Sequence, residues 1–295
     1  MILTYNNKIV MSGNKMVSYQ LPDNTLLFKF GKSSYDPSSL TTLTSATWTR
    51  VSAEPNIWLW DARGVETTNW SRAFYRAFNG NPSSSTTGPV SIIGAGELTI
   101  PTTLGWSVSP WYGMFRESLS LTDVCVLRFP NVTFSGQIFN GCKNINIAGL
   151  YVPNTTSLNS AFKAGNNQTS NFTHVGQIVT TNKLTDVEQM FYGAANLLEA
   201  PYFETSGVTN MKSILYVCKS IKSIPLYHTD SVTNVDTAFG GCFLVETGTL
   251  AMYQQLSSLT NIPHHTSTFT NCGRDTTTGA AELAQIPKSW GGTMA

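Results

Sequence analysis

The chain has little charge. Charged residues make up 12% of it, about half of the ~25% that is usual in soluble proteins, and the net charge is +1. This balance provides no basic field for nucleic acid or an anionic membrane, so we expect neither as a partner. Serine, threonine, asparagine and glycine must supply most of the polar surface, which is typical of a rigid extracellular or virion β-protein. Disorder is not expected, because 7 tryptophans and 15 phenylalanines need burial.

Long apolar segments are also missing. No apolar run approaches the ~20 residues of a transmembrane helix, so we expect no membrane insertion. Met1–Tyr19 has no apolar core followed by a small-residue cleavage site, which argues against a signal peptide. A protein of this kind that works outside a cell would arrive by another route, such as assembly into a particle. The alternative is that the sequence lacks its natural signal.

Motifs for catalysis or metal binding are equally scarce. No Cys-x-x-Cys pair occurs and the four histidines do not cluster with cysteines, which argues against zinc. Glycoside hydrolysis needs two carboxylates about 5–9.5 Å apart. The acidic residues are instead scattered, and only Glu188 and Asp236 share one position of the repeat described below, where solvent exposure explains them. We expect a non-enzymatic protein with no cofactor and no metal; a capsular polysaccharide depolymerase is the lesser alternative.

The sequence does contain a repeat. A large apolar residue, here called the anchor, is followed three positions later by a small residue or cysteine and near position six by Leu or Ile. Val-Thr-Asn often precedes the next copy. Successive anchors are 24, 23, 29, 24, 24 and 30 residues apart, so two copies carry insertions. The anchors are Phe115, Phe139, Phe162, Phe191, Leu215, Phe239 and Phe269, with a degenerate first copy around Phe74.

This spacing predicts the fold class. Apolar residues at intervals of three suit a short helical or 3-10 turn that leads into a short strand. A repeat length near 24 lies within the ~20–29 residues of leucine-rich repeats. One copy cannot bury its apolar face alone, whereas stacked copies place equivalent residues in continuous columns. We therefore expect a mainly β protein with short helical or 3-10 turns, organised as a leucine-rich-repeat-like solenoid of about seven to eight turns.

Cysteines mark one of these columns. Four of them follow an anchor by three positions, where other copies have serine, glycine or alanine. Such a set indicates a small buried slot, in which a free cysteine behaves as a small hydrophobe. A disulfide between neighbouring turns, such as Cys218 to Cys242, would also fit. The predicted structural column comprises Cys142, Cys218, Cys242 and Cys272 with the anchors Phe139, Phe191, Phe239 and Phe269.

Three regions follow from this organisation. Residues 1–60 hold short strands and are expected to form an N-terminal β module, which either anchors the protein or caps the first turn of the solenoid. Residues 61–272 are the predicted solenoid. Residues 273–295, which include Trp290, are expected to cap its far end.

The repeat resembles a known family. Val187–Leu198, together with Val208–Met211, is similar to the BspA-like (DUF285-type) leucine-rich repeat, because anchor, small slot and Val-Thr-Asn segment recur together. The resemblance extends from about Trp111 to Asn271. It implies a surface adhesin of a bacterium or protist, or a phage structural protein. The repeat motifs of the family imply no catalysis.

Segments outside the repeat carry a second resemblance. Leu26–Pro37 and Asn56–Asp61 are similar to proteins of gut-bacterial, Bacteroides-type phages that carry such repeats. The terminal Ile286–Gly292 resembles the end of those chains. This second resemblance implies that the protein belongs to a virion.

Two sets of aromatic residues are candidates for ligand binding. Flat indole rings can stack on sugars, so Trp106 and Trp111, from a tryptophan-rich N-terminal part, are candidate glycan contacts. The alternative is that they fill uneven volume in a cap and in irregular first turns. Tyr151, Phe203 and Tyr227 follow their anchors by twelve positions and would form a ladder on one face, the usual binding surface of repeat proteins. The alternative is a stacking ladder beneath a loop.

The leading functional hypothesis is a virion fibre or receptor-binding protein on the exterior of a phage particle. The N-terminal region would contact other virion proteins, and the solenoid would attach to a host surface glycan or protein. We expect a homo-oligomer, for which a trimer is one form. The alternative is a secreted BspA-like adhesin on a bacterial cell surface.

Overall fold

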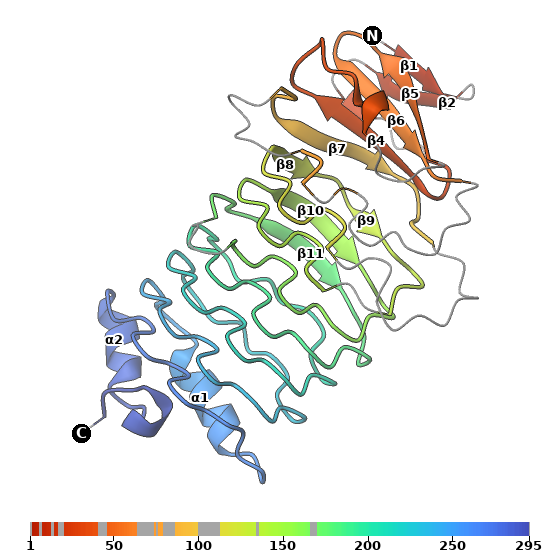
Figure 1. Cartoon of the computed structure of the whole chain (residues 1–295). Helices are drawn as coiled ribbons and strands as arrows, with labels where there is room; N and C mark the ends of the chain where they lie inside the picture. Colours follow the sequence, from red (N-terminus) through yellow and green to blue (C-terminus); the bar gives the residue numbers. More distant parts are fainter. Residues whose placement is uncertain are drawn as a thin grey trace.

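The computed structural model describes residues 2–5, 8–12, 15–16, 21–40, 46–63, 74, 76–78, 86–99, 113–133, 136–165 and 170–294, with the backbone alone for residues 2–16. It is mainly β, with an eight-stranded mixed sheet and two short α-helices. The molecule is elongated, and its order along the long axis follows the sequence (Figure 1). The N-terminal strands lie at one end and the two helices at the other.

The N-terminal strands are antiparallel. A three-stranded sheet has the order β1 (Ile2–Tyr5), β2 (Lys8–Ser12) and β3 (Lys15–Met16). In the larger sheet, β4 (Thr25–Phe30) lies between β6 (Asn56–Asp61) and β7 (Val90–Ala95), and β5 (Thr47–Ser52) pairs with β6. A 3-10 turn, η1 (Pro37–Ser39), precedes β5.

The position of β4 in the sheet explains why its sequence is almost continuously apolar. Phe28 and Phe30 belong to the main core, whereas Leu27 packs on the opposite face against Ile57 and Leu59. A strand that is covered on both faces needs apolar residues at successive positions, and an alternating pattern would leave one face polar. This part of the sheet is therefore a core element.

The large sheet changes from antiparallel to parallel at β7. From there on, β8 (Leu121–Val124), β9 (Leu127–Arg128), β10 (Asn146–Tyr151) and β11 (Val175–Val179) are joined by parallel pairing. Beyond β11 the pairing continues as isolated parallel bridges. These bridges link Ser157, Asp186, Asn210, Asn234 and His264 in turn, at separations of 29, 24, 24 and 30 residues. The separations equal those between anchors, so each segment pairs with the equivalent residues of the next.

The anchors form a row through the core. The rings from Phe74 to Phe191 stack one on the next at centroid distances of 5.2, 5.4, 5.5 and 5.3 Å, and Phe239 stacks on Phe269 at 5.5 Å. Leu215, which is fully buried, continues the row between these two groups. Each anchor N–H donates to a carbonyl of the next segment, as from Phe191 to Ile214 at 2.9 Å. The segments are therefore held at the spacing of neighbouring β-strands.

The slot three positions after the anchor holds a small hydrogen-bond donor. The Cys142 thiol donates to the carbonyl of Phe115 at 2.9 Å, and the Cys218 and Cys242 thiols make the same bond to the preceding anchor at 3.1 Å. In the first copy the Ser118 hydroxyl donates to Phe74 at 2.8 Å. Every described cysteine is free. Cysteine and serine can replace each other in this slot because both are small and both donate this hydrogen bond.

The Val-Thr-Asn segments carry a ladder of threonine hydroxyls and one further polar contact. The hydroxyls of Thr185, Thr209 and Thr233 each donate to the carbonyl of the threonine one segment back, at 3.1 to 3.2 Å. The amide of Asn210 donates to the Asp186 carboxylate at 3.1 Å. These side-chain contacts tie neighbouring segments together in addition to the backbone hydrogen bonds between them, such as those from Gln189 to Lys212 and from Phe191 to Ile214.

The two α-helices lie at the C-terminal end. The helix α1 (Thr249–Ser257) lies in the long copy between Phe239 and Phe269, and α2 (Thr277–Leu283) follows the last anchor. The final 3-10 turn, η2 (Lys288–Trp290), accepts the N–H of Phe269 through the Trp290 carbonyl. Among the described residues no helix is both long and apolar enough to cross a membrane.

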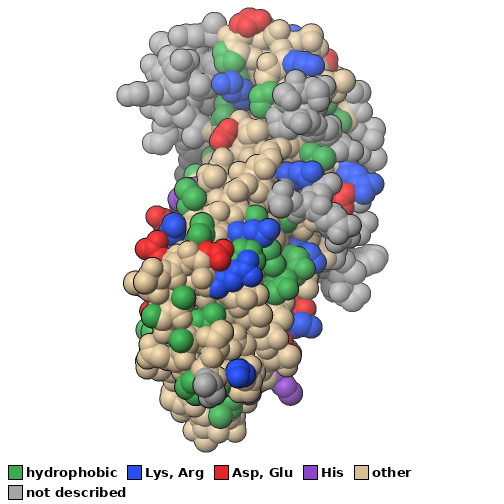
Figure 2. Space-filling model, turned by 90° about the vertical axis from the view of Figure 1, so that its left-hand side faces the viewer, with side chains coloured by type: hydrophobic (Ala, Val, Ile, Leu, Met, Phe, Trp, Pro, Cys, Tyr) green, Lys and Arg blue, Asp and Glu red, His purple; other side chains and the backbone are tan. Residues whose placement is uncertain are grey.

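Most of the surface is neutral. On the face shown in Figure 2, the backbone and the side chains that are neither charged nor hydrophobic together predominate, and a few Lys and Arg side chains gather near its middle. This agrees with the charged content of 12%. Recognition on such a surface depends mainly on hydrogen-bonding groups and on single charges.

Candidate functional site

The predicted twelve-residue ladder is placed mostly inside the protein. Phe203 and Tyr227 are 2% and 0% exposed and pack together with ring centroids 5.6 Å apart. The Tyr227 hydroxyl donates to the carbonyl of Pro201 at 2.9 Å. Tyr151 is half-buried, and the Arg128 guanidinium lies 5.2 Å from its ring centroid. The Phe203 and Tyr227 rings therefore serve packing and are not offered to a ligand.

The insertion after Phe162 alters the register of this ladder. Tyr151 pairs with Val179 of β11 and the buried Leu150 pairs with Ile178. The Thr180 hydroxyl donates to the carbonyl of Glu204 as the Thr205 hydroxyl donates to that of His228, so Phe203 and Tyr227 continue the row of Leu150 and Ile178, and Tyr151 lies outside it. The neighbouring Tyr202 and Leu226 are the exposed residues of these segments, at 53% and 58%. In an extended chain, adjacent side chains point to opposite faces, so a shift of one residue exchanges buried and exposed positions.

The other predicted residues are placed as follows. Trp106 and Trp111 lie outside the described residues. Cys142, Cys218, Cys242 and Cys272 and the anchors Phe139, Phe191, Phe239 and Phe269 are all buried. Burial raises the pKa of the Cys142 and Cys272 thiols to about 12, and it raises the pKa of the other two still further. These thiols stay protonated near neutral pH and have structural roles. In the described part of the chain, no three or more His, Cys, Asp or Glu side chains form a group able to hold a metal ion.

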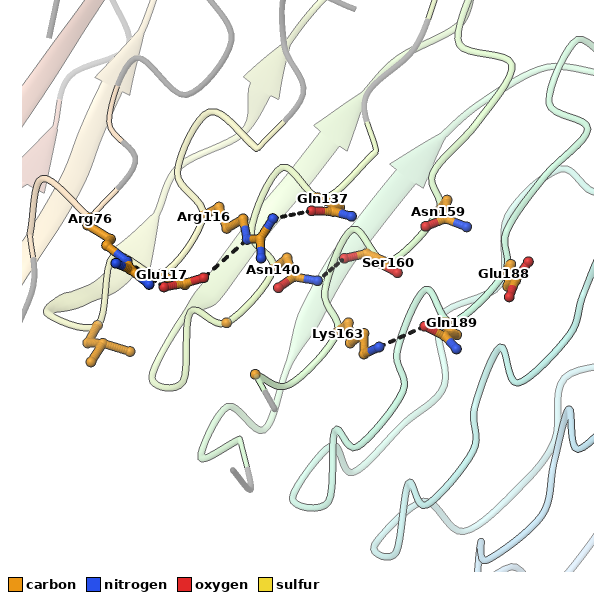
Figure 3. Close-up of a pocket in the computed structure, with 13 residues that line it drawn as sticks. Arg76, Arg116, Glu117, Gln137, Asn140, Asn159, Ser160, Lys163, Glu188 and Gln189 are labelled. Carbon is orange, nitrogen blue, oxygen red and sulfur yellow. Dashed lines mark hydrogen bonds and ion pairs between the residues drawn. The ribbon is translucent and has the colours of Figure 1, made fainter. Parts of the chain in front are cut away.

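A polar groove runs along the residues that flank the anchors. Its volume is about 610 Å³, and its side chains come from successive segments that lie side by side (Figure 3). The anchors and the residues directly before them point into the core, and the groove is lined mainly by residues two or three positions before and one or two positions after the anchors. The lining residues are Arg76, Arg116, Glu117, Leu119, Gln137, Asn140, Gly141, Asn159, Ser160, Lys163, Gly165, Glu188 and Gln189.

The local backbone explains which residues reach the groove. Gln137, Ser160 and Gln189 each precede an anchor by two positions and have φ values of 57°, 53° and 56°. This left-handed conformation makes a tight turn, which directs the anchor inward. The same tight turn recurs at every anchor of the groove, so equivalent polar side chains lie in rows.

One end of the groove is an ion-pair cluster. The Glu117 carboxylate accepts from the Arg76 guanidinium at 2.6 Å and from that of Arg116 at 3.2 Å. Arg116 also donates to the Gln137 side-chain oxygen at 2.7 Å. Two guanidinium groups thus share one carboxylate, and this end of the groove has an excess of positive charge.

Lys163 lies farther along the groove. Its ammonium donates to the Gln189 side-chain oxygen at 2.7 Å and lies 4.9 Å from the centroid of the Tyr192 ring. Burial lowers the pKa of Lys163; the Glu188 carboxylate opposes this shift and the Arg116 guanidinium reinforces it. None of the described carboxylates forms an ion pair with Lys163. The groups that contact the Lys163 ammonium are the neutral amide of Gln189 and the aromatic ring of Tyr192.

The two carboxylates that share a repeat position are engaged in structural contacts. Glu188 accepts from Asn210 at 3.0 Å and lies 4.0 Å from the Lys212 ammonium. Asp236 accepts from the N–H of Thr266 at 2.6 Å. The segment that carries Lys212 lies between those that carry Glu188 and Asp236.

No motif in the sequence indicates the groove directly. Its polar residues lie one to three positions from the anchors, as Gln137 and Asn140 do around Phe139 and Ser160 and Lys163 do around Phe162. A search for polar residues at fixed distances from each anchor would have found them.

Comparison with known proteins finds one family. The model of the family described as Mycoplasma protein of unknown function, DUF285, matches residues 109–222 and again residues 156–272. Together the two matches cover more than half of the chain. No curated protein and no solved structure matches it.

Proposed function

The chain belongs to the DUF285 family, and on that premise we propose that it is a non-enzymatic attachment protein. In this proposal residues 61–272 form a BspA-like leucine-rich-repeat solenoid of about seven to eight turns. The solenoid presents the polar groove to a glycan on a host-cell surface. The stacked anchors and the parallel bridges at repeat spacing support the solenoid, because each segment then buries its apolar face on the next.

The groove is the observation that carries the proposal. Amide, hydroxyl and cationic side chains converge there along a concave surface of about 610 Å³. Sugars present many hydroxyl groups, and planar amides such as those of Gln137 and Gln189 can both donate to and accept from them. A concave site with several placed polar groups is the usual form of a specific binding site.

We place this attachment protein on a phage virion. The low charge supports this location, as does the similarity of Leu26–Pro37 and Asn56–Asp61 to phage proteins with such repeats. Residues 1–60 would contact other virion proteins, and the groove would face the host. Symmetric assembly, as a trimer or another homo-oligomer, would multiply weak glycan contacts through avidity.

A bacterial surface adhesin is the second candidate. The description of the matching family as a Mycoplasma protein favours it, because it associates the repeat with a cellular organism. Both candidates use the repeat surface for attachment, and they differ in where the protein is mounted. Mass spectrometry of purified virions separates them: its absence from particles would contradict the virion location and leave the adhesin.

Binding to whole candidate host cells tests the attachment function itself. We expect the purified protein to bind, and periodate treatment of the cells to abolish binding. Replacing Gln137 and Gln189 by Ala should weaken binding about tenfold, since each removes a hydrogen-bonding amide from the groove. Gln285→Ala is the matched control, because Gln285 is an exposed residue just after α2 whose amide donates to the Ala281 carbonyl. Periodate-resistant binding, or release of reducing sugar from the cells, would contradict a non-enzymatic glycan-binding role.

A further inference from the structure

The position directly after the anchor changes character along the molecule. It is Lys163 in the groove, then Tyr192 and Tyr216 in the next two segments. Backbone hydrogen bonds of 2.9 Å join these segments beside the side chains in question, from Ala164 to Tyr192 and from Gly193 to Tyr216. The two tyrosine rings lie 5.3 Å apart at 37°. A single row therefore leads from the Lys163 ammonium across two aromatic rings.

The cation at the start of this row forms no ion pair with a described carboxylate, and the Glu188 carboxylate acts on it from a greater distance. At the other end of the groove Glu117 serves both guanidinium groups, whereas no described carboxylate forms an ion pair with Lys163. Lys163 is half-buried, and its only side-chain hydrogen bond among the described residues goes to the neutral oxygen of Gln189. A desolvated charge is stabilised most by a hydrogen-bonded group of opposite charge. An incoming carboxylate would supply that group.

The two tyrosine rings are held in place by neighbouring segments. Both are half-buried. The ring of Tyr216 lies against Gly240, where an added Cβ would come within 3.1 Å of Tyr216 Cε2. Glycine at this position therefore lets the ring lie close to the backbone of the next segment. Neither phenol hydroxyl has a hydrogen-bond partner among the described residues, so both are available to a ligand.

We propose that Lys163, Tyr192 and Tyr216 form a subsite for a carboxylate-bearing sugar of an acidic polysaccharide. The ammonium binds the sugar carboxylate, and the apolar faces of that sugar and of its neighbour lie against the outer edges of the two rings, since the Lys163 ammonium and the Tyr216 ring occupy the two sides of the Tyr192 ring. This inference rests on the proposed glycan-binding function and adds the chemical class of the ligand. An acidic peptide would use the cation and would gain little from the rings.

Soluble polysaccharides test the subsite. The purified full chain is titrated with polygalacturonate, alginate and hyaluronate, and with the same polymers after chemical reduction of their carboxylates to alcohols. We expect at least one acidic polymer to bind and its reduced form to bind at least tenfold more weakly. Polyglutamate tests simple charge attraction. Binding to none of the three polymers, equal binding to a reduced form, or equal binding to polyglutamate overturns the inference.

Matched variants identify the residues. Lys163→Gln removes the charge and should weaken binding by about 10- to 100-fold, whereas Lys163→Arg keeps most of it. Tyr192→Ala should weaken binding about fivefold or more, and Tyr192→Phe should keep it because the ring remains. Lys183→Gln is the control, since Lys183 is an exposed lysine that likewise donates to a neutral amide oxygen, that of Asn154. Each variant is first checked for an unchanged melting temperature.

The outcomes separate the inference from the function on which it rests. Periodate-sensitive binding to host cells that survives Lys163→Gln, and that polygalacturonate, alginate and hyaluronate do not inhibit, overturns the acidic subsite and leaves the glycan-binding function standing. A wild-type protein with no periodate-sensitive binding removes the proposed function together with the subsite.

Discussion

In the N-terminal part of the chain, β4 pairs with β6 over six residues and with β7 over five, whereas beyond β11 pairing shrinks to single bridges. The aromatic residues differ in the same way. The Phe28 ring contacts those of Phe30, Trp48, Phe74 and Phe78 at 5.3 to 6.1 Å. In the repeat segments from Phe115 on, the anchor rings that the structure describes stack on anchor rings of adjacent segments, and Phe269 also stacks on Trp290.

The comparison shows two ways to order a β structure. One uses continuous backbone ladders around a many-sided aromatic cluster. The other joins tightly turned segments by backbone hydrogen bonds between equivalent residues and adds columns of repeated contacts: stacked anchors, thiols that donate to the preceding anchor, and a threonine ladder. A cluster concentrates its contacts at a central residue, whereas a column distributes them between nearest neighbours.

Alkaline pH should have the largest effect on the difference between the two regions, because it acts on the buried thiols of the repeat column. The unfolded thiols titrate near pH 9.0, whereas burial keeps Cys142 and Cys272 protonated to about pH 12. Above pH 9 the unfolded state therefore binds fewer protons, and stability falls as pH rises by about 1.4 kcal/mol per pH unit for each column thiol. Urea unfolding at pH 7, 9 and 10 measures the loss. A Cys218→Ala, Cys242→Ala double variant should lose less between pH 9 and 10, and an equal loss would contradict the assignment.

Two substitutions of phenylalanine by alanine should show how far local damage spreads in each of the two regions. Phe28→Ala and Phe191→Ala each remove a fully buried ring and should cost about 3–5 kcal/mol. The difference lies in how far the damage spreads. By hydrogen exchange, Phe28→Ala should loosen β4, β6 and β7 together. Phe191→Ala should expose mainly amides of the segments that begin at Phe162 and Leu215. Faster exchange of β4 in the Phe191 variant would show that the column does not confine its defects.

The smallest expected effect concerns one backbone position of the column. Two residues after the anchor, Gly193 and Gly241 have φ values of 76° and 73°, and Val217 has the same left-handed conformation at 62°. A β-branched residue is strained there. Val217→Gly should therefore stabilise the protein by about 0.5–1 kcal/mol, and the reciprocal Gly193→Val should destabilise it by about 1–2 kcal/mol. Thermal melts of both variants provide the test; a lower melting temperature for Val217→Gly would argue against strain.

Sequence reasoning located the core of the repeat segments better than their surface. Anchors and slots are visible in the sequence because a buried column tolerates few residue types, which then recur at fixed spacing. The donor role of the slot thiols was not predicted, because it depends on which carbonyl lies opposite each thiol. The reduction of strands to single bridges was also not predicted, since bridges leave no alternating pattern.

The candidate site was the harder part to predict. The row of Tyr151, Phe203 and Tyr227 was counted from the anchors, but Tyr151 pairs with Val179 and lies outside the buried row of Ile178, Phe203 and Tyr227, and the surface ring is Tyr202. The groove consists of neutral polar residues, which are common everywhere in a chain with so little charge. Lys163 becomes distinctive only through its neighbours Gln189 and Tyr192, which are 26 and 29 residues away.

The succession of equivalent bridges also has a genetic consequence. Asn210 and Asn234 occupy matching places one segment apart, each accepting the N–H of the residue two positions later. Excising the 24 codons for residues 210–233 would join Thr209 directly to Asn234, and every column would persist with one member fewer. Duplicating those codons would add one member. The length of the molecule can therefore change by inheritance. Unequal recombination can add or remove one segment at a time while both ends of the protein stay unchanged.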